Sequence, residues 1–581
     1  MLPVILFHAG FELFSGGFVG VDIFFVISGY LITTIIINEL EQGKLSIIKF
    51  YERRARRILP ALFVVMFATL LAGYFLLMPD EYKNLGQSFV ATSFFSNNIL
   101  LGLTSGYWDL ASEFKPLLHT WSLGIEEQYY VIVPILLLMV WKSGNNSIIY
   151  LLWSIFITSF LFAVWFVNIS PDWAFYILPT RAWELCIGAL TAVYLAKYSD
   201  AIHELKYANI LSLFGIVSII ASIFIFDNTI LSPGASLLIP VGGAVLIIGF
   251  CRPRSISYKL LANKFAVSVG LLSYSLYLWH QPVFAFLRAY SIERPTFSDF
   301  MMLLPLVFLL SYLTWRFVES PFRNKGLISQ RFIFAFSITG SILFTTGGFY
   351  LNKSYGMASR VFNNGVTIAD MDKRIYNERA FKYKNNEFSD LSKTKILIIG
   401  NSFARDFTNL TLEKFDTNHI EIVYRDDLKE CINDHLYESY GSLFVDADVI
   451  IFASGNFQED CYLKDIDFAQ QNKKEIFYIG TKSFGYNLNW IIQLDDEDRK
   501  NRFNHVDDAT ILHEKNMKAA IPEKNFISLL GPILVNQSIP ITDNMGRMLS
   551  TDRVHLTRYG AIFLGKKSVA PTRYAEIFKQ D

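Results

Sequence analysis

A serine, an aspartate and a histidine in the last third of this 581-residue chain have the types and order of a nucleophilic triad. Ser402 directly follows a short apolar run, 395–399, and Gly400 permits a tight turn there. Asp552 and His555 are three residues apart, and on one helical turn they would share a face. A carboxylate then holds one imidazole nitrogen while the other takes the serine proton. We therefore predict a catalytic triad.

Each part of this pattern also has an ordinary structural explanation. A serine after a strand most often caps the following helix, and an Asp-x-x-His pair most often lies on the surface. The occurrence of both parts at the two ends of one α/β segment favours catalysis over these alternatives.

Polar residues in the apolar first part of the chain form a second set of candidates. His8 ends an apolar run, where a neutral imidazole is suited to act as a general base on a hydroxyl; the alternative is an interfacial histidine at a helix end. A cluster of four arginines is suited to bind phosphate. The alternative is that its charges only orient the chain in a membrane. The four are Arg53, Arg54, Arg56 and Arg57.

Four more polar residues lie in or beside apolar segments: Glu126, Arg181, Glu184 and His280. We interpret them as supporting groups, with Arg181 and Glu184 as a structural ion pair. No pattern of metal ligands is recognised, so no metal is expected.

The charge distribution divides the chain in two. Lys plus Arg and Asp plus Glu both number 52, so the basic excess of a nucleic-acid-binding protein is absent. Hydrophobic residues make up 52% of the chain, yet 1–350 carries 41 charged residues and the shorter 351–581 carries 63. We therefore predict a membrane domain at 1–350, a linker at 351–392 and a soluble domain at 393–581.

Ten segments of 1–350 are long and apolar enough to be spanning helices. They are 17–37, 59–78, 127–142, 147–168, 175–196, 208–226, 233–250, 266–288, 299–318 and 331–350. The more polar 86–104 is predicted to be a surface or re-entrant helix. Residues 1–8 resemble the outer half of a truncated further helix, which would bring the spans to eleven.

Lysine and arginine are retained on the cytoplasmic side of membranes, which orients the spans. One set of alternate loops holds 17 of these residues and the other set holds 3. The basic loop 38–58 is therefore predicted to be cytoplasmic, and the part after about residue 351 to be outside the cytoplasm.

Short apolar runs at 395–399, 449–453 and 475–480 predict buried parallel strands with crossover helices. Ligands of such sheets lie beyond the carboxyl ends of the strands, where Ser402 is expected. Cys431 and Cys461 lie in this part; they either pair outside the cytoplasm or remain free.

At this point the chain resembles known families. Residues 1–350 resemble membrane acyltransferase family 3, and 390–570 resemble a fused SGNH-hydrolase domain, a flavodoxin-like parallel sheet. The stretches that carry the first resemblance are 8–10, 20–30, 53–60, 119–129, 181–184, 277–280 and 318–321. The combined architecture resembles bacterial O-acetyltransferases that modify surface polysaccharides, notably lipopolysaccharide O-antigen.

The resemblance implies acetyl-CoA as donor, bound by the arginines at 53–57, and a lipid-linked glycan as acceptor. It implies His8 as the membrane catalytic residue, Ser402, Asp552 and His555 as the triad, and Asn456 as an oxyanion-hole candidate. It also implies a bacterial cytoplasmic (inner) membrane protein with a periplasmic C-terminal domain. Alternatives are a polysaccharide O-acetyl esterase, or a transporter without chemistry of its own.

The sequence departs from these families in two places. The basic residue that the first family has eleven positions before its histidine would precede Met1. The Gly-Asp-Ser-His block of the second family reads Gly-Asn-Ser-Phe at 400–403, which keeps the serine and leaves Asp552 and His555 as the only evident base.

Overall fold

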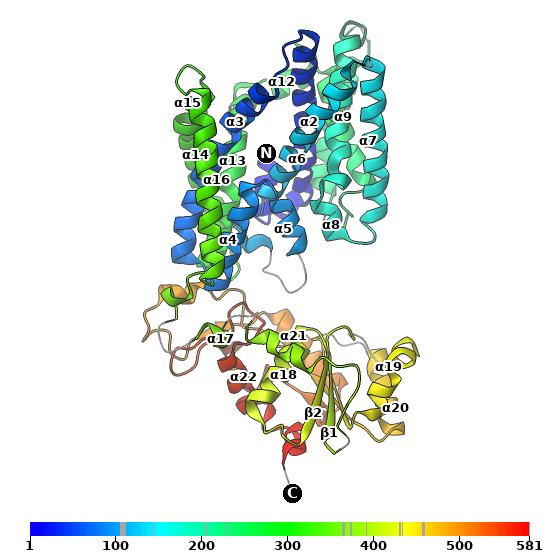
Figure 1. Ribbon diagram of the computed structural model, residues 1–581, viewed down its shortest axis with the longest axis vertical. Coiled ribbons are helices and arrows are strands. Elements are labelled where there is room, and N and C mark those ends of the chain that lie inside the picture. The colour runs from blue at the N-terminus through cyan, green and yellow to red at the C-terminus, as the bar shows by residue number, and fades with distance from the viewer. Residues whose placement is uncertain are drawn as a thin grey trace. The chain divides into compact units, whose positions relative to one another are not determined.

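The computed structural model of the chain has two compact units (Figure 1). It describes residues 1–104, 112–142, 144–203, 206–227, 229–362, 367–371, 375–390, 392–428, 432, 434–455 and 459–579. The first unit comprises Met1–Tyr74, Lys83–Arg288 and Pro295–Lys353, and the second comprises Phe75–Tyr82, Ala289–Arg294 and Ser354–Asp581.

The first unit is built from helices, and each of the ten segments predicted to span the membrane contains one. The long helices are α2 (Val19–Glu41), α3 (Ile47–Leu76), α6 (Thr120–Trp141), α7 (Asn145–Phe166), α9 (Leu178–His203), α10 (Ala208–Ile225), α11 (Leu238–Phe250), α13 (Lys264–Tyr290), α14 (Phe297–Thr314) and α16 (Gln330–Lys353). Among the described residues, seven helices are long and apolar enough to cross a membrane.

Helices α9, α11 and α13 are outside those seven. Helix α11 has 13 residues, although its apolar stretch begins at Ala235. Helices α9 and α13 carry buried polar residues, Arg181 and Glu184 in α9 and His280 in α13. The presence of helices at all ten positions is confirmed, whereas the number of spans and their orientation stay predictions.

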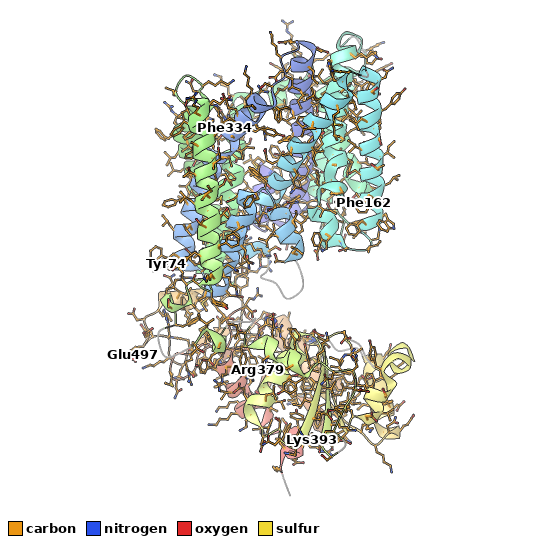
Figure 2. The ribbon with its side chains drawn as sticks, in the orientation of Figure 1. Tyr74, Phe162, Phe334, Arg379, Lys393 and Glu497 are labelled. Atoms are coloured by element: carbon orange, nitrogen blue, oxygen red, sulfur yellow. The ribbon has the colours of Figure 1, made fainter. Side chains whose placement is uncertain are left out.

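Apolar side chains cover the outside of the helical unit. Leu161 and Trp165 of α7 are 62% and 59% exposed, and Leu343 of α16 is 64% exposed. Figure 2 shows side chains projecting from these helices, with Phe162 of α7 and Phe334 of α16 labelled. Exposed apolar surface of this extent is typical of helices in contact with lipid.

The segment 86–104, predicted as one surface helix, contains two. Helix α4 (Pro79–Ser93) ends before Phe95, which has a positive φ of 52°, and α5 (Asn97–Leu103) follows. Buried amides hold the break, because Asn97 donates to the Leu117 carbonyl at 3.0 Å and Asn98 to the Tyr176 carbonyl at 2.9 Å.

The second unit contains a five-stranded parallel sheet of order β2-β1-β3-β4-β6. The strands are β1 (Thr394–Gly400), β2 (Ile420–Arg425), β3 (Val449–Ala453), β4 (Glu475–Ile479) and β6 (Phe526–Ile527). The three runs predicted as parallel strands are β1, β3 and β4. This order is that of flavodoxin-like sheets, with its switch point between β1 and β3. A separate antiparallel pair joins β5 (Phe503–His505) and β7 (Ser538–Pro540).

Helices and a buried apolar core surround this sheet. The helices are α17 (Ile368–Met371), α18 (Ser402–Lys414), α19 (Asp434–Asp446), α20 (Glu459–Gln471), α21 (Asp508–Ala520) and α22 (Arg558–Leu564). Part of the segment expected to be a linker belongs to the packed unit, because the 3₁₀ helix Asn377–Tyr383 packs on α18 and Arg379 bonds Asn409 Oδ1 at 2.8 Å.

Of the two cysteines expected to pair or to remain free, Cys461 is disulfide-bonded and Cys431 lies outside the described residues. Cys186 and Cys251, in the helical unit, are free thiols.

A buried carboxyl in the second unit predicts a pH-dependent stability. Asp465 accepts hydrogen bonds from the Tyr478 hydroxyl at 2.6 Å and the Ile432 amide at 2.7 Å, and its burial raises its pKa to about 6. The folded state favours the protonated form of Asp465, and this preference adds to the free energy of unfolding. The added stability is complete below the ordinary pKa of an aspartate and is lost as the pH rises to about 6.

We expect Asp465→Asn, which mimics the protonated group, to remove this dependence. Between pH 4 and pH 7, wild type should lose on the order of 2 kcal/mol more unfolding free energy than the variant. Thermal unfolding of the full chain across this pH range measures the difference, and identical pH dependence in both proteins would contradict the assignment.

Candidate functional site

The serine predicted as nucleophile begins helix α18 at the carboxyl end of β1. The turn depends on Gly400, which has a φ of +143° and approaches β3 so closely that a Cβ would lie 2.2 Å from the Ala453 carbonyl oxygen. The helix is capped by Asn401, whose Oδ1 accepts from the Phe403 amide at 3.0 Å. The Ser402 hydroxyl is therefore not the cap, which was the ordinary explanation for a serine at this place.

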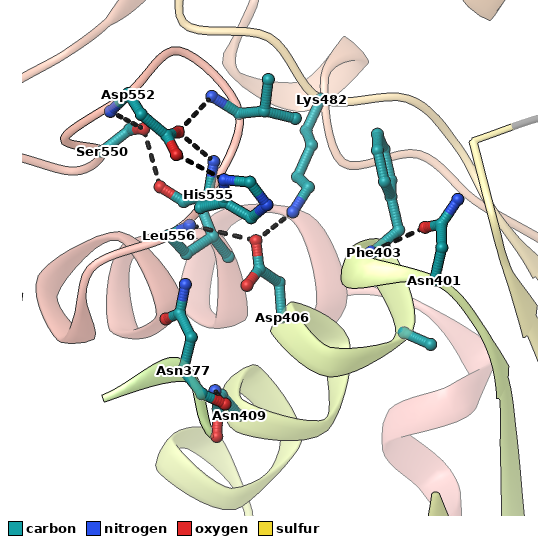
Figure 3. Close-up of polar contacts among 12 residues, drawn as sticks. Asn377, Asn401, Phe403, Asp406, Asn409, Lys482, Ser550, Asp552, His555 and Leu556 are labelled. Atoms are coloured by element: carbon teal, nitrogen blue, oxygen red, sulfur yellow. Dashed lines mark hydrogen bonds and ion pairs between the residues drawn. The ribbon is translucent and has the colours of Figure 1, made fainter. Parts of the chain in front are cut away.

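Asp552 and His555 form the expected pair, but not on a helical turn. Both residues lie in an irregular loop before α22, so that part of the prediction is wrong. Asp552 Oδ1 accepts from the amides of Val554 at 3.0 Å and His555 at 2.8 Å, and this turns the loop back on itself. Asp552 Oδ2 then lies 2.5 Å from His555 Nδ1 (Figure 3). A carboxylate at Nδ1 orients the imidazole and leaves Nε2 as the basic nitrogen.

The loop of His555 is tied to the helix that begins with Ser402. Helices α18 and α22 pack together, and Asp406, one turn after Ser402, accepts from the Leu556 amide at 3.0 Å. Ser402 is 6% exposed, and its hydroxyl has no hydrogen-bond partner among the described residues. The structure thus assembles the Asp–His half of the triad, while the serine begins a helix that packs against α22 and makes no hydrogen bond to the histidine.

A buried ion pair beside the serine was not predicted from the sequence. Lys482 forms an ion pair with Asp406, with side chains 2% and 1% exposed (Figure 3). The Lys482 ammonium also lies 4.5 Å from the centre of the Phe403 ring, and burial lowers its pKa below the ordinary value. Lys482 follows β4 at the carboxyl edge of the sheet, a position that would have indicated it. Asp406 gave no comparable signal.

The proposed oxyanion residue, Asn456, lies outside the described residues. Its neighbour Gly455 has a φ of +72°, and its carbonyl is 2.8 Å from His513 Nε2.

In the helical unit, His8 ends the short helix α1 (Leu2–His8) and lies beside His280 of α13. Their ring centres are 5.3 Å apart, and the His8 carbonyl accepts from Arg288 at 2.6 Å. The ring of His280 is fully buried. The structure therefore brings together two histidines that the sequence treated separately.

The four arginines expected to bind the coenzyme have different environments. Arg53 pairs with Glu39 at 2.9 Å, Arg54 with Glu127 at 2.8 Å, and Arg56 with Glu52 at 2.8 Å. Arg56 also donates to the carbonyls of Phe322 and Ile328 at 3.1 and 2.8 Å. The fourth, Arg57, is exposed and has no ion pair within the part of the chain that the structure describes.

Arg181 and Glu184 form the predicted ion pair, and Asp22 also contacts Arg181. Arg181 contacts Glu184 at 2.8 Å, as expected, and also Asp22 at 2.6 Å. The remaining acidic residue, Glu126, accepts from the Ser28 hydroxyl at 2.7 Å. These contacts join α2, α6 and α9, which indicates a structural role for Arg181 and Glu184.

Together these features define a multi-pass membrane protein with an α/β unit, in which a serine begins a helix that packs against the helix following an Asp–His pair. The model of the acyltransferase domain family matches residues 2–316, more than half of the chain. The chain therefore belongs to this acyltransferase family.

Similar proteins include the peptidoglycan O-acetyltransferase OatA of Listeria monocytogenes, 32% identical over 57% of this chain and 55% of the relative. The O-acetyltransferase OatA of Staphylococcus aureus is 26% identical over 72% of this chain and 74% of its own length. The chain spans about half the length of the first of these relatives. No solved structure matches it.

We expect the Asp406–Lys482 pair to maintain the fold around the serine. Lys482→Met leaves a buried carboxylate without its cation, which should lower the unfolding free energy by about 3–5 kcal/mol. Replacing both partners, Asp406→Asn with Lys482→Met, should recover most of this loss. Thermal unfolding of the full chain measures both variants, and equal stability of the single variant and wild type would contradict the expectation.

Proposed function

We propose that this protein is an O-acetyltransferase that moves acetyl groups from cytoplasmic acetyl-CoA across the membrane to hydroxyls of an extracytoplasmic polysaccharide. The observation that carries the proposal is the acyltransferase family match over 2–316, which includes His8 and the arginine cluster. The named relatives support a cell-surface acceptor, because the first acts on peptidoglycan. The two acceptors to test are peptidoglycan and lipopolysaccharide O-antigen, the latter in its lipid-linked form.

The donor phosphates would bind at Arg57. Arg53, Arg54 and Arg56 already have anionic partners, whereas Arg57 is an exposed residue without an ion pair among the described residues. Arg54, Arg323 and Glu126 lie within electrostatic reach of Arg57, and the two arginines are already paired with Glu127 and Glu319. Guanidinium groups bind phosphate with two parallel hydrogen bonds, so this position suits the coenzyme better than the other three.

The transfer would take place in two stages. At the membrane site His8 takes the proton of an acceptor hydroxyl, whose oxygen forms an ester with the acetyl group as the thioester C–S bond breaks and the coenzyme leaves as a thiol. Ser402 then attacks this first ester, and its proton passes through His555 to the departing acceptor oxygen. The resulting acetyl-serine ester is attacked by a sugar hydroxyl, whose proton returns to Ser402 through the same histidine. The parallel sheet and the serine at its carboxyl edge support an SGNH-type assignment for this unit.

The proposed location is a bacterial inner membrane, with the α/β unit in the periplasm. The asymmetry of basic loops supports this orientation. The disulfide-bonded Cys461 supports it further, because structural disulfides persist mainly in oxidising compartments.

Arg57→Gln tests the donor site. Loss of a charge-assisted phosphate contact should lower kcat/KM for acetyl-CoA by about 10- to 100-fold. The matched control is Arg331→Gln, which removes the charge of another exposed arginine at the start of α16 and should stay within about twofold of wild type. Thiol release by the full chain in proteoliposomes measures both, and equal effects of the two variants would exclude a specific donor role for Arg57.

Ser402→Ala tests the second stage. Transfer of label from radioactive acetyl-CoA to isolated peptidoglycan or O-antigen should fall about a thousandfold or more, because the nucleophile is lost. Ser483→Ala, which changes another serine of the same unit, should retain transfer. Full transfer by the Ser402 variant would refute the acetyl-serine stage. If wild type instead releases existing acetyl groups, the protein is an esterase. If wild type shows neither transfer nor release, the result indicates a transporter.

A further inference from the structure

Three histidines from separate parts of the helical unit form a row of imidazole rings. His280 lies in the middle, with its ring centre 5.3 Å from that of His8 and 5.6 Å from that of His119. They come from the end of α1, the residue before α6, and the middle of α13. More than 100 residues separate each from the next, so only the fold brings them together.

The hydrogen bonds of the central ring determine which of its nitrogens is basic. His280 Nδ1 lies 2.7 Å from the Tyr277 carbonyl oxygen, which can only accept, so Nδ1 carries the hydrogen. In the neutral ring the lone pair is then on Nε2. That atom is buried and has no hydrogen-bond partner among the described residues. A buried basic nitrogen without a donor is costly, and this one is free to accept a proton.

The two outer rings differ in their exposure. His119 is 2% exposed, and both of its ring nitrogens are buried without a partner within the described ranges. His8 is partly exposed and its ring makes no hydrogen bond to any described residue. The row therefore runs from a partly exposed residue to two residues that are enclosed.

The backbone around the row is held in place by other polar groups. Arg288 donates to the His8 carbonyl at 2.6 Å, and the Tyr277 hydroxyl donates to the His119 carbonyl at 2.8 Å. These bonds fix the main chain and leave the imidazole nitrogens unused. The described residues contain no group of ligands placed to hold a metal ion.

We propose that His280 is a positioning residue that accepts the proton collected by His8, with His119 as the next acceptor along the row. This inference rests on the proposed function. When the acceptor O–H is deprotonated by His8, a C–O bond forms and the thioester C–S bond breaks. The proton moves from His8 to His280 Nε2, so that no imidazolium has to persist at His8, and finally protonates the coenzyme thiolate.

His280→Asn tests the inference. An asparagine amide can still donate to the Tyr277 carbonyl, so the variant removes Nε2 while preserving the Nδ1 contact. The full chain is assayed in proteoliposomes with acetyl-CoA and soluble peptidoglycan fragments, and kcat and KM are determined separately. We expect kcat to fall at least about tenfold, with KM for acetyl-CoA within about twofold of wild type.

The matched control is Phe284→Leu, one turn further along α13. Phe284 is fully buried and its ring centre is 6.3 Å from that of His280, so this variant disturbs the same packing without removing a base. Its kcat should stay within about threefold of wild type. His119→Asn should give a smaller loss of kcat than His280→Asn, because His119 lies further from His8.

The outcomes separate this inference from the proposed function. If wild type transfers no acetyl group, the proposed function fails and the inference fails with it. If wild type transfers and His280→Asn keeps its kcat, or loses no more than Phe284→Leu, only the role of His280 is overturned. Should His280→Asn not fold, His280→Gln is judged by the same criteria, and failure of both to fold would overturn the proposal in favour of a structural role.

Discussion

The helical unit depends on the pairing of charges that are buried away from water. Arg181 is 1% exposed at its side chain and contacts Asp22 of α2 and Glu184 of its own helix α9. A buried charge without partners would be strongly destabilising, so these helices can pack only in the register that brings the three groups together. Gly29 and Gly188 make the same approach possible, because a Cβ on either would overlap the backbone of the other helix.

The second unit also depends on the pairing of buried charges. The buried Asp406–Lys482 pair joins the helix after β1 to the segment after β4, and Asp406 also receives the Leu556 amide. Three segments of the chain therefore meet at one carboxylate, next to the serine and the Asp–His pair. Such an arrangement positions catalytic groups through the requirement that each buried charge be compensated.

Some polar groups at the candidate sites lack this compensation. Arg57 is the arginine of its cluster without an anion among the described residues, the Ser402 hydroxyl caps no helix, and His280 Nε2 has no donor within the same set. Under the proposed function, a phosphate, an acyl group and a proton are the species that these three groups would receive.

Local patterns in the sequence determined the ten long helices of the first unit, strands β1, β3 and β4, the turn at Gly400 and the Asp552–His555 pair. Each depends on residues close together in the chain. Only the tertiary structure decided that the Asp–His pair lies in a loop and that Arg57 alone of its cluster has no ion pair among the described residues. It also decided that Lys482 pairs with Asp406 and that His119 lies beside His280. These depend on contacts between segments often more than 70 residues apart, where hydrophobic periodicity carries no information about which side chains meet.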